Sequence, residues 1–291
     1  MKDKESTTIR KAVINQAINY IFEHIDEDIT VEDVAKYCSY SKYHLMRMFK
    51  EDMDEALYQF IKRVRLERSA WRLKVEKERS ITEIGETYGY SSSNFATAFK
   101  KHLDISPADY RRHSERMVEE SSFSHGIKLN ELDDAEKRIT IEYLEPFTVL
   151  YERKKGNYHN LSDEWCDFIE KYKYFSTEDT LYIECTIDDP SITDENSCMY
   201  ELCQTVIPDH PALKAHPEIM CHDFEGGKYA VYHFKGIPQL LFMVYQEIFC
   251  RWLSKTGNEL DERPIIDIYR KIEEDGYMEI DICFPLKTKQ S

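Results

Sequence analysis

The first half of the chain repeats itself at an offset of 50 residues, and this repeat restricts the possible folds more than any other feature. The matching pairs include Val31 and Ile81, Val34 and Ile84, Tyr40 and Tyr90, Ser41 and Ser91, Phe49 and Phe99, and Lys50 and Lys100. Each copy also begins with a capping box, Thr30-x-x-Asp33 or Ser80-x-x-Glu83, a pattern that starts helices. The repeat therefore predicts two copies of one helical unit.

Within each copy the sequence predicts a short helix, a tight turn and a second helix. The turns fall at residues 38–40 and 88–90, and Ser41 or Ser91 can cap the helix that follows. In each second helix three apolar residues recur at i, i+3 and i+4, which is the spacing of one buried stripe. They are Leu45, Met48 and Phe49 in the first copy and Phe95, Ala98 and Phe99 in the second.

The opposite face of each second helix is predicted to be free to touch DNA. The candidate DNA-binding residues are Tyr43, Met46, Arg47, Lys50, Ser93, Asn94, Thr97 and Lys101. Arginine can pair bidentately with guanine and asparagine with adenine, whereas hydroxyls and methyls make less specific contacts. Residues 55–75 predict one long helix between the copies, roughly 30 Å in length, close to the roughly 34 Å between successive major grooves. One chain is therefore expected to fill two grooves, so that a monomer suffices for DNA and the oligomeric state stays open.

Specific motifs within residues 9–112 resemble the DNA-binding domain of the AraC/XylS family of transcription regulators. The matching stretches are S-K-Y-H-L-x-R-x-F-K at 41–50, Tyr88-Gly89-Tyr90, and F-x-x-x-F-K-K-x-x-D-I-S-P-A-D-Y-R at 95–111. The resemblance implies that Tyr43, Met46 and Arg47 read bases in the first copy, and Ser93, Asn94 and Thr97 in the second. It also implies transcription activation through contact with RNA polymerase.

The charge of the chain is distributed unevenly, which matters because the net charge of −16 is unusual for a DNA-binding protein. Residues 121–291 hold 18 Lys and Arg against 33 Asp and Glu, whereas residues 36–116 hold 17 against 12. The acidity therefore belongs to the second half, and the first half keeps a modest basic excess suited to phosphate contact.

The second half alternates strand-like runs with two helical stretches and contains a weaker repeat. Strands are predicted at 138–152, 180–187, 198–207, 229–234, 265–270 and 278–284, and helices at about 160–172 and 237–254. A strand ending in Lys155-Gly156 precedes the helix with Trp165, and a strand ending in Lys235-Gly236 precedes the helix with Tyr245. This pattern predicts two pseudo-symmetric βαβ-type halves with an antiparallel sheet.

Residues 137–287 resemble the GyrI-like effector-binding domain of Rob and BmrR-type regulators. The matching stretches include Pro146-Phe147-Thr148-Val149, Gly156-Asn157-Tyr158, Asp188-Asp189-Pro190, Arg263-Pro264-x-x-Asp267-x-Tyr269 and Asp281-x-x-Phe284-Pro285-Leu286. The resemblance implies a cleft in which an acid and aromatic side chains hold a small ligand, often an amphipathic cation. The candidate ligand-binding residues are Asp267, Tyr269, Asp281, Tyr151, Tyr158, Trp165 and Tyr232.

These predictions divide the chain into an all-α double helix-turn-helix domain at 1–118, a linker at 119–136 and an α+β effector domain at 137–288. Eight cysteines without a C-x-x-C pair indicate reduced thiols, so that neither a disulfide framework nor a metal site is expected. The sequence predicts a cytoplasmic, non-enzymatic regulator with DNA, RNA polymerase and a small-molecule effector as partners, without cofactor or membrane contact. Two alternatives stay open for the second half, a small-molecule hydrolase and a protein-interaction module.

Overall fold

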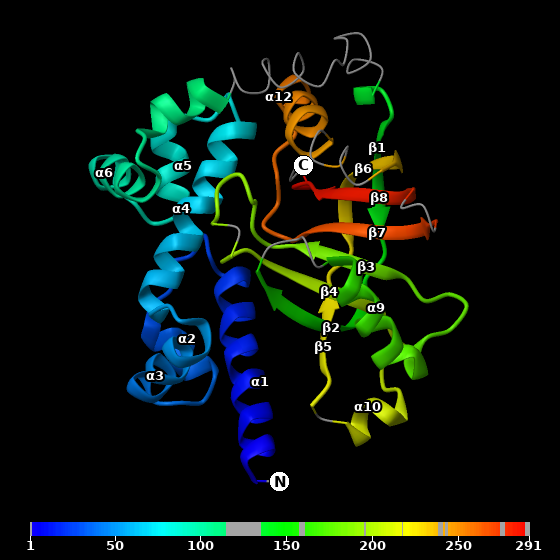
Figure 1. Ribbon diagram of the computed structural model, residues 1–291. Helices are drawn as coiled ribbons and strands as arrows, with labels where there is room; N and C mark the ends of the chain where they lie inside the picture. Colours follow the sequence, from blue (N-terminus) through cyan, green and yellow to red (C-terminus); the bar gives the residue numbers. More distant parts are fainter. Residues whose placement is uncertain are drawn as a thin grey trace. The chain divides into compact units, whose positions relative to one another are not determined.

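The computed structural model describes residues 2–114, 135–156, 161–194, 196–216, 218–237, 241, 244–273 and 277–288, with only the backbone described at 2–8, 246 and 247. The chain forms two compact units, Met1–Glu115 and Arg116–Ser291 (Figure 1). In the described part of the chain, no helix has the length and apolar character needed to cross a membrane.

The first unit is helical throughout, and its element bounds reproduce the repeat (Figure 1). The helices are α1 (Lys2–Glu23), α2 (Val31–Tyr37), α3 (Lys42–Met53), α4 (Leu57–Val75), α5 (Ile81–Thr87) and α6 (Ser92–Leu103), followed by helical residues 107–114. Helices α2 and α5 begin and end 50 residues apart, as do α3 and α6. The predicted double helix-turn-helix arrangement is confirmed.

Both predicted capping boxes are formed. Thr30 Oγ1 accepts a hydrogen bond from the backbone N–H of Asp33 at 3.2 Å, and the Thr30 N–H donates to Asp33 Oδ2 at 2.8 Å. The same two bonds at Ser80 and Glu83 measure 3.1 and 2.7 Å. Each pair satisfies backbone donors that would otherwise lack partners at the start of the helix.

The turn between the two helices of each copy has the same left-handed backbone. Ser39 has φ 59° and Gly89, its partner in the repeat, has φ 77°. A left-handed conformation costs a residue with a Cβ about 1–2 kcal/mol, whereas glycine adopts it freely. The second copy therefore carries the better suited residue at this turn.

Helix α4 links the copies and supplies much of their core. Phe60 and Val64 are buried, and the ring of Phe60 meets that of Phe49 on α3 edge to face, with centroids 5.1 Å apart. Helices α5 and α6 approach each other closely at Gly85, because a Cβ there would lie 2.8 Å from Cγ of the buried Phe95. Only glycine fits there without movement of the ring.

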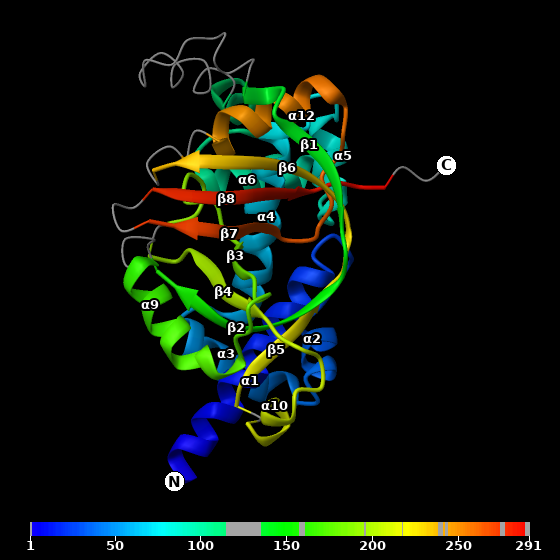
Figure 2. The ribbon, with the colours of Figure 1, turned by 90° about the vertical axis from the view of Figure 1, so that its right-hand side faces the viewer.

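The second unit contains an eight-stranded sheet in which every pairing is antiparallel (Figure 2). Its strands are β1 (Ile139–Leu144), β2 (Phe147–Lys155), β3 (Tyr182–Thr186), β4 (Met199–Thr205), β5 (Met220–Phe224), β6 (Gly227–Gly236), β7 (Ile265–Ile272) and β8 (Met278–Pro285). The helical elements are α9 (Leu161–Tyr172), η2 (Lys173–Phe175), α10 (Pro211–Ala215), the π-helix η4 (Val244–Phe249) and α12 (Cys250–Thr256).

The strand order β1-β6-β8-β7-β3-β4-β2-β5 reads symmetrically about the β7–β3 pair. The succession β2, α9, β3, β4 in one half matches β6, η4 with α12, β7, β8 in the other. Strand β1 pairs with β6, and β5 pairs with β2, so each half receives its outermost strand from the segment that precedes the other half. The predicted pair of pseudo-symmetric halves is confirmed, and this exchange explains how they form one sheet.

Two details of this unit differ from the sequence-based expectation. The predicted run over 138–152 is two strands, separated at Glu145 and Pro146. Strand β1 lies at one end of the sheet order and β2 is second from the other end. Pro146 has no N–H with which to continue a strand ladder. Strand β5 was not predicted, since it is short and follows a stretch rich in proline and histidine.

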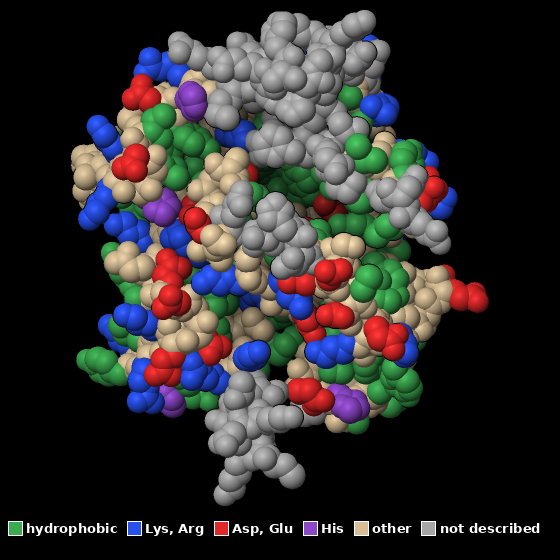
Figure 3. Space-filling view, in the orientation of Figure 1, with side chains coloured by type: hydrophobic (Ala, Val, Ile, Leu, Met, Phe, Trp, Pro, Cys, Tyr) green, Lys and Arg blue, Asp and Glu red, His purple; other side chains and the backbone are tan. Residues whose placement is uncertain are grey.

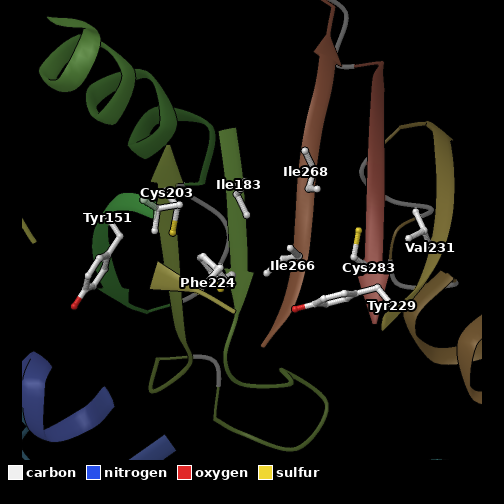
Figure 4. Close-up of a cluster of buried hydrophobic side chains, with 11 residues drawn as sticks. Tyr151, Ile183, Cys203, Phe224, Tyr229, Val231, Ile266, Ile268 and Cys283 are labelled. Atoms are coloured by element: carbon white, nitrogen blue, oxygen red, sulfur yellow. The ribbon is translucent and has the colours of Figure 1, made fainter. Parts of the chain in front are cut away.

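The helices pack on one face of the sheet, and a second apolar cluster covers the other. Trp165 and Phe168 of α9 pack against Leu150 and Leu202, and Phe249 of η4 stacks on Phe284 with centroids 3.8 Å apart. The opposite face holds a cluster drawn in Figure 4 that consists of Val149, Tyr151, Ile183, Cys185, Cys203, Phe224, Tyr229, Val231, Ile266, Ile268 and Cys283. The parity of each residue along its strand therefore decides which face it occupies.

Candidate functional site

Helices α3 and α6 each bury one stripe and expose the other, as a DNA-reading helix must. Leu45 and Phe49 are fully buried, and Phe95 and Phe99 contact each other at a centroid distance of 5.4 Å. Seven of the eight predicted DNA contacts are exposed, and Tyr43 is 84% exposed. The exception, Met46, is half-buried.

A cavity of about 790 Å³ lies between the two copies and is lined by residues of both α3 and α6. Met46 of α3 lines it together with Asn94, Thr97 and Lys101 of α6. The other predicted contacts, Tyr43, Arg47, Lys50 and Ser93, are not among its lining residues. Half of the predicted DNA-binding residues thus share one recess, and the rest lie on the outer faces of the two helices.

Helix α4 adds two cations to this cavity that the sequence reasoning did not select. Lys62 and Arg65 line it beside Lys101, and Figure 3 shows further Lys and Arg side chains over the region that Figure 1 fills with α2 to α6. Arg65 is also held in place, because its Nη2 donates to the carbonyl oxygen of Glu27 at 2.6 Å. Their signal in the sequence was the spacing of three residues, close to one helical turn, between two basic positions of the helix that links the copies.

In the second unit, two carboxyl groups face each other at the centre of the pseudo-symmetric sheet. Glu184 of β3 is the direct register partner of Asp267 of β7, and the two residues are 5% and 3% exposed. Tyr269 Oη donates to Glu184 Oε2 at 2.8 Å, and Tyr245 Oη donates to Asp267 Oδ2. Each acid is therefore held by one tyrosine.

Burial dominates the electrostatics of this pair. It raises the pKa of Glu184 to about 7, although the hydroxyl of Tyr269 and the indole of Trp165 favour the ionised form. Burial and the neighbouring Glu184 also raise the pKa of Asp267 well above its ordinary value, although the hydroxyl of Tyr245 opposes the shift. In the described part of the chain, no basic side chain forms an ion pair with either carboxyl group.

The structure brings three of the predicted ligand-binding residues to the pair or to its face of the sheet. Tyr269 contacts Glu184, and Trp165 of α9 lies edge-on to Tyr269 with ring centroids 5.3 Å apart. Tyr232 lies in the same cross-strand row as Asp267, two strands away, where it accepts a hydrogen bond from Arg138 at 2.6 Å. These residues give the acid pair an aromatic surrounding.

Two other predicted residues lie on the opposite face and do not join Asp267. Tyr151 belongs to the cluster in Figure 4, where it lies on the same face as Cys203. Asp281 is the register partner of Ile268, a member of that cluster, and it pairs with Arg270 and His233 at 2.7 and 2.6 Å. Tyr158 lies outside the described residues.

Sequence reasoning did not select Glu184 and Tyr245 as members of this site. Glu184 had a signal, since it is an isolated acid within the apolar run Leu181–Thr186. Tyr245 had one too, because the repeat of the two halves aligns it with Trp165. Only the pairing of β3 with β7 shows that the two acids are adjacent.

A further polar cluster lies on the face of the sheet that holds Tyr151. Glu201, Cys203 and His222 place atoms that could hold a metal ion within 4.8 Å of one another. Burial alone would raise the pKa of Glu201, but the charge of Arg153 and the hydrogen bond with His222 lower it to about 2. Arg153 Nε donates to Glu201 at 2.9 Å, and His222 lies 3.2 Å from its other oxygen. We interpret the cluster as an ion-pair network that ties β2, β4 and β5 together.

Comparison with known proteins gives a match for each unit. Residues 34–113 match the model of a helix-turn-helix domain, and residues 137–287 match that of the GyrI-like small molecule binding domain. Regulatory protein SoxS of Salmonella typhimurium is 37% identical over 100 residues, which are 34% of this chain and 92% of SoxS.

Two further relatives match the chain over a similar length. Multiple antibiotic resistance protein MarA of Escherichia coli is 33% identical over 115 residues, which are 39% of this chain and 88% of MarA. Transcriptional regulator Rob of Salmonella typhimurium is 36% identical over 104 residues, which are 35% of this chain and 36% of Rob.

Proposed function

We propose that this protein, which belongs to the AraC family of DNA-binding regulators, activates transcription in response to a cationic ligand. Through residues 137–287 the chain also belongs to the GyrI-like small molecule binding domain family. The family membership establishes a DNA-binding regulator with a small-molecule-binding domain. The sites, the ligand class, the contact with RNA polymerase and the non-enzymatic role are our proposal. One observation carries this proposal. The first unit exposes one face of each of α3 and α6, and the second unit buries two acids that have no basic partner among the described residues.

For DNA, we assign base reading to the exposed residues of α3 and α6. The most selective contacts are Arg47, outside the recess between the copies, and Asn94, which lines it. Arg47 has no hydrogen bond or ion pair with any residue that the structure describes, so its guanidinium is available for guanine. We assign phosphate contact to Lys62 and Lys101, which line the cavity between the reading helices.

The phosphate assignment is tested with a duplex of mixed sequence. Replacing a phosphate-contacting lysine should weaken binding to every duplex and reduce the salt slope by about one unit. We expect this result for Lys101→Ala. The matched control is Lys214→Ala, which removes the same charge from an exposed lysine of α10 in the second unit. An equal loss in both variants would show only a dependence on net charge and would contradict the assignment.

For the ligand, we assign Asp267 as the principal anion and Trp165, Tyr245 and Tyr269 as the aromatic surrounding. A cation gains both from a buried carboxylate and from ring faces. A neutral isostere at Asp267 should therefore remove most of the affinity. Binding of tetraphenylphosphonium to the full chain, measured by titration calorimetry, tests this with Asp267→Asn.

The control for that measurement is Glu279→Gln on β8, an acid that pairs with Lys235 and touches neither carboxyl group of the site. We expect unchanged affinity in the control and at least a tenfold loss in Asp267→Asn. Equal affinities in both variants would refute the assignment of Asp267, and conversion of a bound compound into a product would refute the non-enzymatic role.

A further inference from the structure

Within the described ranges, no element packed against the acid pair places a positive charge beside it. Among the described residues, its polar neighbours are Tyr269 of β7, Tyr245 of η4 and Trp165 of α9. Glu164 of α9 lies next to Trp165 in the chain. Tyr200 of β4 donates to Glu164 at 2.7 Å rather than to the pair. The surroundings are therefore neutral or acidic.

The two flanking strands contribute only apolar side chains in the same cross-strand row. Leu202 of β4 is the register partner of Glu184, and Ile282 of β8 is that of Asp267; both are fully buried. Two like charges in such a low-dielectric row repel each other strongly, so the pair cannot hold two full negative charges at neutral pH. Some of its charge must be neutralised by protons when nothing else is bound.

One polar atom at this site is buried without a partner and points to a bound molecule. Among the described residues, none donates a hydrogen bond to Asp267 Oδ1. Asp267 is 3% exposed. Buried polar groups are rarely left unsatisfied in a folded protein, because each costs about 1–3 kcal/mol. An acceptor is thus available beside the paired acids, whereas the indole of Trp165 already interacts with Glu184.

We propose that Glu184 is the second counter-ion of the ligand site and that a bound cation takes the place of the protons that the empty pair holds. This inference rests on the proposed function of the same site. The exchange balances in charge, since each positive charge that enters releases one proton to solvent. A ligand with two positive charges can replace two protons, so the site favours a dication over a monocation of similar apolar area.

Proton counting by titration calorimetry tests this on the full chain. The probes are tetraphenylphosphonium, with one permanent charge, and dequalinium, with two, so that neither ligand can itself supply the proton. Runs at pH 6 in buffers of different ionisation enthalpy give the number of protons released. We expect about one for tetraphenylphosphonium and more than one for dequalinium, with monocation affinity rising about tenfold per pH unit below the titration of the pair.

The variant Glu184→Gln separates the two acids. We expect it to limit dequalinium to about one released proton while tetraphenylphosphonium still binds through Asp267. Glu279→Gln is the control and should leave both proton counts as they are in the wild type. The wild-type measurement alone suffices should Glu184→Gln fail to fold.

Two results would overturn the inference and are distinguishable from each other. Binding of either cation without proton release, or a dequalinium count unchanged in Glu184→Gln, would refute the exchange and leave the proposed cation site standing. Failure of both cations to bind the wild-type chain would refute the proposed ligand class and the exchange with it.

Discussion

The contact of Gly85 with Phe95 gives a quantitative prediction for the packing of the second reading helix. In Gly85→Ala the added Cβ would lie 2.8, 2.9 and 3.0 Å from Cγ, Cδ1 and Cβ of Phe95, a side chain that is 1% exposed. Overpacking of this kind costs about 1–3 kcal/mol, and the better helix propensity of alanine returns up to about 1 kcal/mol. Because all three contacts are at or below 3.0 Å, we expect the overpacking to cost about 2–3 kcal/mol, which leaves a net loss of about 1–2 kcal/mol in the free energy of unfolding.

The loss is measured by urea unfolding of the full chain, followed by circular dichroism at the helix band. Glu86→Ala is the control, since it places alanine at the next position of α5 on the exposed side. In a Phe95→Leu background the cost of Gly85→Ala should fall, because the smaller side chain leaves room for the methyl group. A neutral or stabilising Gly85→Ala would refute the close approach of α5 and α6.

Two further predictions concern the ion-pair network and the repeated turn. Glu201→Gln should lower the free energy of unfolding by about 1–3 kcal/mol, because it removes the carboxylate that is hydrogen-bonded to Arg153 and His222. In the folded protein the pKa of Glu201 is about 2, below its ordinary 4.5. The difference in unfolding free energy between the wild type and the variant should therefore be full above pH 4.5 and shrink as the pH falls toward 2. Ser39→Gly should raise stability by about 0.5–1 kcal/mol, and Gly89→Ala should lower it by about 1 kcal/mol, because both positions have a left-handed backbone. Shifts of the same sign in the melting temperatures of the two variants would contradict this prediction.

The helical unit could be predicted from the sequence almost to the residue because its signals are local. The caps at Thr30 and Ser80 fix where α2 and α5 begin, and the apolar spacing of Leu45 and Phe49 fixes which face of α3 is buried. The period of 3.6 residues determines which side chains of a helix share a face, so no contact with a distant part of the chain is needed to predict them. The exposed positions of the DNA-binding candidates follow directly.

The ligand site could be predicted only in part because strand pairing is not local. The face of the sheet on which a residue lies depends on register, and a difference of one residue reverses it. Asp267 and Tyr269 are on the face of the helices, whereas Tyr151 and Asp281 are on the other. Glu184 shows the same limit, since only the β3–β7 register places it opposite Asp267.

Selection of binding sites tests the central claim most directly, because a regulator of this kind must read a defined sequence with both helices of one chain. Full-length protein would be selected against a random duplex library at a stated salt concentration, and the enriched duplex would then be bound to Arg47→Ala and Lys214→Ala. The account predicts an asymmetric motif with two patches about one helical turn apart, and a loss of about 1–3 kcal/mol for Arg47→Ala that is confined to one patch. No enrichment, or an unchanged affinity of Arg47→Ala for the enriched duplex, would contradict it.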